Sequence, residues 1–157
     1  MRRPLNRAGE IAVMDVRELR SDAEIAMAFP LMSMLRERIT AVTFVADVRQ
    51  QQLQGYELLG AFDDGRLVAL AGVRRTRTLS RGEHLFVDDL VTDPSMRGRG
   101  YGRRLMQWLA DRSVAEGLNR IYLDSRITAR GFYEKLGFKF HTSIPCWLEL
   151  KRESSSS

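Results

Sequence analysis

The chain has little of the chemistry that disulfides, metals and membranes require. Its 157 residues include one cysteine, Cys146, and two histidines, so neither an internal disulfide nor a metal cluster is expected. No apolar run approaches the ~20 residues of a membrane-spanning helix, and no signal peptide is evident at the N-terminus. Cys146 stands in an apolar run and is interpreted as a buried small residue. We expect a cytoplasmic protein with no metal and no membrane partner.

Length and composition indicate one folded domain. Hydrophobic residues make up 44% and charged residues 29%, as in ordinary globular proteins. Because no linker or repeat divides the chain, we expect a single domain over residues 10–151. Residues 1–9 and 152–157 are expected to be flexible tails.

The net charge of +5 raises the question of nucleic acid, but no helix-turn-helix or RNA-binding signature is present. We therefore expect no nucleic-acid partner. Much of the charge lies in two arginine clusters, one of which surrounds a glycine-rich segment. The second is either a solvated strand edge or a patch that steers an anion, and comprises Arg74, Arg75, Arg77 and Arg81.

The most informative segment runs from residue 84 to residue 109. An apolar run at 84–91 indicates a strand, Pro94 marks a turn, and Arg97-Gly-Arg-Gly-Tyr-Gly102 leads into an amphipathic helix. The first N–H groups of a helix have no intrahelical partner, and the helix dipole adds positive charge. Glycines let a phosphate approach the backbone closely. The segment therefore predicts an anion site.

Spacing alone leaves alternatives open for this glycine turn. No Gly-Lys-Ser/Thr follows, so it is not a Walker loop. It fits a nicotinamide-dinucleotide fingerprint poorly, although Asp124 stands near the position of that motif's acid. The plainer interpretation is a glycine turn on a basic surface helix.

Two motifs in order resemble the GNAT superfamily of N-acetyltransferases. Arg97-x-x-Gly100-x-Gly102 after a strand resembles the family's acetyl-CoA pyrophosphate loop. Ala129-Arg-Gly-Phe-Tyr133-Glu-Lys-Leu-Gly137-Phe138 resembles its A-x-x-F-Y-x-x-x-G-F helix and turn. The resemblance spans residues 86–138 and implies a GNAT-like α/β fold. Its central sheet would be mixed, mostly antiparallel and flanked by helices, in the order β-α-α-β-β-β-α-β-α-β-β.

The resemblance also implies an activity. Acetyl-CoA would be the co-substrate, and its acetyl group would pass directly to a primary amine of a small molecule or peptide. A catalytically silent CoA-binding sensor or interaction domain is the alternative, and homodimers are common in the family. By analogy, backbone N–H groups near residues 90–92 would bind the oxyanion. The expected cofactor contacts are Leu90, Val91, Thr92, Arg97, Gly98, Arg99, Gly100, Tyr101, Gly102 and Arg103.

Tyr133 and an acidic pair are the catalytic candidates. Tyr133 holds the family's acid position, and a phenol can hydrogen-bond or protonate a departing thiolate. Asp88 and Asp89 resemble the pair in small-amine members, including glucosamine-phosphate N-acetyltransferases. Side chains alternate along a strand, so at most one aspartate faces the acceptor unless a bulge intervenes. Asp88 is slightly favoured as the base; Glu83 and His84 are weaker candidates, and water could relay the proton.

Local signals place the helices before this segment. Ser21 and Glu24 predict a capping box at the start of a helix that reaches about residue 38. Pro30 should kink or split that helix near residue 29. Thr40 is expected to cap a further helix reaching about residue 52, with an apolar face that includes Val42 and Val48.

Turn and strand signals complete the order. A first strand is expected at 11–19, with Ile11 and Val13 inward, and Asp63-Asp64-Gly65-Arg66 predicts a hairpin turn. Gly72 marks a bulge or close approach within the next strand. Ser125 is expected to cap the helix of Tyr133 and Gly137 to end it. Strands at 138–140 and 144–150 should close the sheet.

Overall fold

The computed structural model describes residues 14–151. The chain divides into two compact units, Met1–Asp124 and Ser125–Ser157, which are described separately. Within residues 14–151, no helix combines the length and apolar character needed to cross a bilayer. Ile11 and Val13, expected in the first strand, lie outside the described residues.

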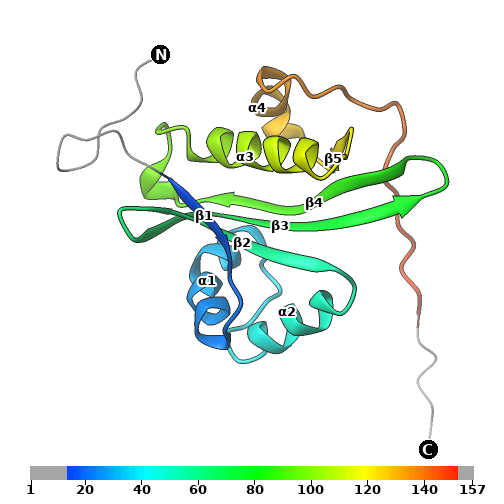
Figure 1. Cartoon of the computed structure of the whole chain (residues 1–157). Coiled ribbons are helices and arrows are strands. Elements are labelled where there is room, and N and C mark those ends of the chain that lie inside the picture. Colours follow the sequence, from blue (N-terminus) through cyan, green and yellow to red (C-terminus); the bar gives the residue numbers. More distant parts are fainter. Residues whose placement is uncertain (1–13, 152–157) are drawn as a thin grey trace, which may run out of the picture. The chain divides into compact units, whose positions relative to one another are not determined.

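The first unit is organised on a five-stranded sheet of order β1-β2-β3-β4-β5 (Figure 1). Its antiparallel strands are β1 (Asp15–Glu18), β2 (Tyr56–Asp63), β3 (Arg66–Thr78) and β4 (Gly82–Thr92). β5 (Ile121–Leu123) runs parallel to β4. The predicted mixed, mostly antiparallel sheet is confirmed. Asp64 and Gly65 have positive φ values of 50° and 74°, as the predicted two-residue hairpin turn requires.

Helices cover both faces of the sheet in this unit. α1 (Asp22–Leu35) and α2 (Phe44–Gln52) lie on one face, and α3 (Tyr101–Ala115) lies on the other (Figure 1). The core on the first face joins α1 and α2 to β2 and β3 and includes Leu19, Ile25, Ala28, Phe44, Val48, Tyr56, Leu58 and Leu70. α3 buries Tyr101, Leu105, Met106 and Leu109.

The first two helices differ from expectation in four respects. The Ser21–Glu24 capping box is confirmed, but Pro30 does not split α1, whose remaining hydrogen bonds and buried face keep it continuous. α1 ends at Leu35 because Arg36, its C-cap, is extended. α2 begins at Phe44, since residues 40–43 form a turn closed by the Phe44 N–H to the residue 40 carbonyl. Val42 is exposed rather than on the buried face.

The second unit contains a 3-10 turn, η2 (Ile127–Ala129), and α4 (Arg130–Lys135). Ser125 does not cap α4, because η2 intervenes and the serine hydroxyl donates to the Arg126 carbonyl. Gly137 ends α4 as predicted, with φ of 87°. The Gly137 and Phe138 N–H groups donate to the carbonyls of residues 134 and 133, which is the Schellman pattern.

The expected closing strands are absent from the described residues. Residues 138–151 carry no strand, although the apolar alternation near residues 144–150 predicted one. A strand needs a neighbour for its N–H and C=O groups, and local pattern does not supply that neighbour. Cys146, expected to be buried, is exposed for the same reason. Ile144, Trp147 and Leu148 are exposed beside it.

Candidate active site

A β-bulge in β4 brings the two adjacent aspartates to one face of the sheet. Gly72 pairs with Asp89 while Val73 pairs with Val87, so Asp88 is an extra residue in β4. The alternation that would separate the two side chains is interrupted at that point. The bulge, which alone would allow both aspartates to face the same side of the strand, is therefore present.

Both carboxylates are held by residues of the face that α1 and α2 cover. Arg74 donates to both oxygens of Asp88, at 2.6 and 2.8 Å. Arg36, at the end of α1, donates to Asp89 Oδ1 at 2.7 Å and to the Asp88 carbonyl at 2.6 Å. Tyr56 donates to Asp89 Oδ2 at 2.7 Å. The Asp89 side chain is 11% exposed and that of Arg36 44%.

The edge of β4 opens beyond the bulge. β5 pairs with β4 only from Leu85 to Val87 among the described residues. The Asp93 N–H bonds to the Val68 carbonyl on β3, at 2.9 Å. Because alternate residues of a strand direct their N–H groups to opposite edges, those of Leu90 and Thr92 point toward the open edge. The expected oxyanion donors thus lie where β4 has no strand neighbour in the described residues.

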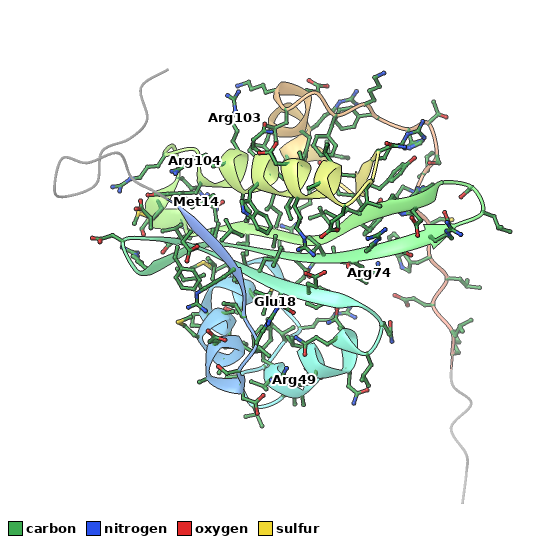
Figure 2. The ribbon with its side chains drawn as sticks, viewed as in Figure 1. Met14, Glu18, Arg49, Arg74, Arg103 and Arg104 are labelled. Atoms are coloured by element: carbon green, nitrogen blue, oxygen red, sulfur yellow. The ribbon has the colours of Figure 1, made fainter. Side chains whose placement is uncertain are left out.

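The glycine-rich segment forms a loop and helix start of the kind that binds anions. Gly98 and Gly100 adopt φ of 79° and 76°, and Gly100 is the N-cap of α3. The first backbone bond of α3 joins the Arg104 N–H to the Gly100 carbonyl, at 3.0 Å. The preceding N–H groups, at residues 101–103, therefore start the helix without an i−4 partner inside it. Arg103 and Arg104 lie at this end of α3 (Figure 2).

Exposed arginines surround this loop, whereas the Tyr101 side chain turns inward. Arg97, Arg99 and Arg103 are exposed. Tyr101 is 2% exposed, and its hydroxyl donates to Asp63. Burial, followed by this contact with Asp63, raises the pKa of Tyr101 above its ordinary value. The Tyr101 hydroxyl is therefore engaged inside the protein.

The β2–β3 turn fixes both ends of the glycine loop. Asp63 accepts from Tyr101 at the exit of the loop. At its entrance, Arg66 donates to Asp93 Oδ2 at 2.9 Å and to Ser95 Oγ at 3.0 Å. Asp93 also accepts from the Ser95 N–H at 2.9 Å, so it caps the turn there. Two residues of one hairpin turn, Asp63 and Arg66, therefore anchor the loop at its two ends.

The second arginine cluster and the weaker base candidates have other contacts. Arg75 and Arg77 lie 3.5 and 3.7 Å from Glu83. The Arg81 guanidinium stacks 4.3 Å from the Tyr122 ring centroid. His84 is 1% exposed and its Nδ1 donates to the residue 82 carbonyl at 2.9 Å. These contacts favour the solvated-edge interpretation over a steering patch.

Tyr133 belongs to the second unit and lies on α4. Its side chain is 9% exposed, and its ring makes T-shaped contacts with Phe132 and Phe138, at centroid distances of 5.0 and 5.3 Å. Burial raises the pKa of Tyr133 above its ordinary value. The hydroxyl therefore remains protonated at neutral pH and can serve as a hydrogen-bond donor.

The sequence did not identify the partners of the acid pair. The helix expected to reach residue 38 includes Arg36, and Arg74 falls in the second arginine cluster, while no local signal singles out Tyr56. Their contacts join segments 14 to 53 residues apart, which no local period can reveal. One available signal was Gly72 inside a strand, because such a glycine often marks the close approach of another group.

Comparison with known proteins identifies a family and several relatives. The profile described as the Acetyltransferase (GNAT) family matches residues 28–138. An uncharacterized N-acetyltransferase of Bacillus subtilis (strain 168) is 31% identical over 134 residues, which cover 82% of this chain and 94% of that protein. The glucosamine 6-phosphate N-acetyltransferase of Trypanosoma brucei brucei is 38% identical over 79 residues, covering 49% of this chain and 54% of that enzyme. A crystal structure of a Trypanosoma brucei acetyltransferase matches 88% of this chain and all of that one, with a TM-score of 0.71 and 27% identity.

Proposed function

Because this chain belongs to the GNAT acetyltransferase family, we propose that it transfers acetyl from acetyl-CoA to a primary amine of a small molecule or peptide. The observation that carries the proposal is the continuous segment from β4 to α3. In this segment a bulge puts two aspartates on one face, β4 has an edge with no strand neighbour in the described residues, and a glycine loop begins α3; these features support the proposal.

The glycine loop is proposed to bind the pyrophosphate of acetyl-CoA. The positive φ values of Gly98 and Gly100 direct backbone N–H groups outward at the start of α3. Arg97, Arg99 and Arg103 supply full charges from the same loop and the first turn. Leu90, Thr92 and Gly102 complete the proposed contacts through their backbone, whereas the N–H of Val91 faces β3 by the same alternation.

The open edge of β4 is proposed to bind the reacting carbonyl. Attack by the amine turns the thioester carbonyl into an oxyanion, which needs N–H donors already in position. The N–H groups of Leu90 and Thr92 point toward that edge. Leu90 directly follows Asp89 in the same strand, and Thr92 lies two positions further on.

The acid pair is proposed to take the proton of the attacking amine, directly or through a water. An ammonium has no free electron pair, so deprotonation must precede attack. Arg74 binds both oxygens of Asp88, whereas Asp89 shares one oxygen with the more exposed Arg36. Asp88 is the more exposed carboxylate, at 25% against 11% for Asp89, but Arg74 occupies both of its oxygens. We take Asp89 as the proton acceptor, because displacement of the exposed Arg36 frees its Oδ1 while Tyr56 keeps Oδ2 in place.

Tyr133 is proposed to donate a hydrogen bond or proton to the departing thiolate. Its raised pKa keeps the phenol protonated, which a donor requires. The electron pair of the C–S bond passes to sulfur, and the proton from the phenol produces free CoA thiol. The nitrogen loses two protons in all: the acid pair takes the first before attack, and the second, lost as the C–S bond breaks, restores the Tyr133 phenol through solvent. The products are the amide, the CoA thiol and one released proton, so atoms and charge balance.

The proposal is tested by two linked measurements. Calorimetry with acetyl-CoA should show micromolar binding that Arg97→Ala weakens. Release of free CoA thiol should then depend on an added amine, and Tyr133→Phe should lower kcat by roughly a hundredfold. Binding without thiol release for any amine would favour a CoA sensor instead. An absence of binding would overturn the proposed cofactor loop.

Amino sugar phosphates are the first acceptors to screen. The Trypanosoma brucei brucei relative that acts on glucosamine 6-phosphate matches half of this chain. The panel should also hold polyamines, aminoglycosides and peptides with a free N-terminus, since the family match specifies no acceptor.

A further inference from the structure

Tyr56 makes a polar contact that its burial requires. It begins β2, is 4% exposed, and packs among the core residues that α1 and α2 cover. A buried phenol hydroxyl needs a hydrogen-bond partner, and that of Tyr56 donates to Asp89 Oδ2 at 2.7 Å. Tyr56 thus reaches from the core to the acid pair.

Gly72 leaves the space that this contact occupies. It lies on β3, between the strands of the two partners, and is paired with Asp89. A Cβ at Gly72 would stand 2.0 Å from the Tyr56 hydroxyl and 2.5 Å from Asp89 Oδ2. Any larger residue would therefore fill the position of the hydrogen bond. Three strands contribute one residue each to this arrangement.

The charged groups around the contact determine that Tyr56 donates and Asp89 accepts. Arg36 from the end of α1 binds the other oxygen of Asp89, while Arg74 from β3 and Asp88 from β4 complete the surroundings. Burial, and then the negative charge of Asp89, raise the pKa of Tyr56 well above its ordinary value. The phenol therefore stays protonated and acts only as a donor to Asp89.

We propose that Tyr56 is a positioning residue, whose hydroxyl fixes the Asp89 carboxylate beside the open edge of β4. The role rests on the proposed function, in which Asp89 receives the proton of the amine. Arg36 binds the other oxygen of Asp89 from an exposed position. Without the Tyr56 hydroxyl, the Asp89 carboxylate can therefore rotate together with the Arg36 side chain. Tyr56 acts through Asp89 and does not touch the substrate.

A double-mutant cycle in amine-dependent CoA release tests this role. Tyr56→Phe removes only the hydroxyl and should lower kcat/KM for the amine by about tenfold or more, while the Kd of acetyl-CoA is unchanged. In an Asp89→Asn background the same change should have less than about a twofold effect. Tyr122→Phe, which removes another hydroxyl in the same sheet, should leave kcat/KM near wild type. Equal losses from Tyr56→Phe in both backgrounds would overturn the proposal.

A second experiment tests the Tyr56–Asp89 hydrogen bond without any enzymatic turnover. Its outcome therefore does not depend on whether the proposed activity is correct. In protein labelled with 3-fluorotyrosine, Tyr56→Phe identifies the fluorine NMR signal of Tyr56. Asp89→Asn should move that signal and leave the signal of Tyr101 in place. Asp63→Asn should do the reverse, since Tyr101 donates to Asp63. A Tyr56 signal unmoved by Asp89→Asn would overturn the proposal even in an active enzyme, whereas a moved signal in a protein that acetylates no amine would leave only the proposed function contradicted.

Discussion

Gly72 shows at the scale of one residue how an absent side chain permits a polar contact. A glycine inside a strand ordinarily weakens it, because the backbone is freer and nothing packs. Here the hydroxyl of Tyr56 and a carboxylate oxygen of Asp89 take the place of the missing Cβ. The contact satisfies a buried donor, and leaving such a donor unpaired costs ~1–3 kcal/mol.

Gly72→Ala should therefore lower the free energy of unfolding by about 1–3 kcal/mol, since the added methyl group overpacks the site. Chemical denaturation of the variant and of the wild type would measure this change in the free energy of unfolding. The matched control is Gly131→Ala in α4, where an added Cβ has nothing within 4 Å and φ is not positive. That change should be neutral or stabilise by about 0.5–1 kcal/mol. Equal stability of Gly72→Ala and wild type would contradict the close approach.

At the scale of an element, the start of α1 depends on a charged cap. The Glu24 carboxylate accepts from the backbone N–H groups of Ser21 and Arg20 and from the Arg17 side chain. Together these contacts lower the pKa of Glu24 from 4.5 to about 2, and the hydrogen bond from the Ser21 N–H contributes most. A carboxyl group whose pKa is lower in the folded state than in the unfolded state stabilises the fold at any pH above the unfolded-state pKa. That stability is lost as the pH falls through the folded-state pKa.

Glu24→Gln should therefore reduce the melting temperature near neutral pH, where the carboxylate is ionised. The difference from wild type should shrink between pH 4.5 and about 2, because wild-type Glu24 also becomes neutral there. Glu37→Gln, at an exposed position after α1, serves as the control. A difference that stays constant over this pH range would show that charge is not the cause.

The hairpin turn between β2 and β3 is predicted to act on acetyl-CoA binding from outside the loop. Arg66→Ala removes the contacts to Asp93 and Ser95 and should raise the Kd of acetyl-CoA several-fold. The free energy of unfolding should change by less than about 1 kcal/mol, since the Arg66 side chain is 55% exposed. Arg20→Ala, which breaks the Arg20–Glu18 ion pair instead, should leave the Kd unchanged. Equal binding by both variants would exclude the anchoring role.

Elements with local signals were predicted from the sequence, and those that need distant partners were not. The Ser21–Glu24 cap, the Asp64-Gly65 turn and the Gly137 stop each depend on a few neighbouring residues. The end of α1 and the start of α2 were misplaced because Arg36 and the residue 40–43 turn have tertiary or competing local contacts. The closing strands were wrong because pairing is not encoded in alternation alone.

For the candidate site, the sequence placed the acid pair, the glycine loop and Tyr133 on their elements. It could not place Tyr56 or Arg36 beside Asp89, since these contacts span 33 and 53 residues. The bulge was foreseen only as an exception, because a register shift is set by two strands together.

At the scale of the whole molecule, the net charge of +5 is unevenly placed. The arginines of the β3–β4 hairpin contact Glu83, Asp88 and aromatic rings. Those of the glycine loop, Arg97, Arg99 and Arg103, are exposed at the start of α3. Within the described residues, three exposed arginines therefore gather where an anionic cofactor is proposed to bind.

Binding of acetyl-CoA should weaken as salt is added. Exposed charges are screened over ~10 Å at 0.1 M ionic strength and ~3 Å at 1 M. The Kd measured by calorimetry should rise several-fold between these conditions, chiefly through slower association. Arg97→Ala should flatten this dependence, while Arg75→Ala, in the hairpin cluster, should not. Salt-independent binding would contradict an electrostatic role for the loop.

The extra residue in β4 shifts by one position the alternation of N–H groups between the two edges of the strand. Before it, the Leu85 N–H faces β5, where it bonds to the Arg120 carbonyl; after it, the Asp93 N–H faces β3. The two residues are eight apart and would face the same edge in an uninterrupted strand. The shared face of the aspartates therefore originates in the extra residue. Deleting Asp88 would restore plain alternation and leave one aspartate, while the N–H groups of Leu90 and Thr92 would still face the open edge.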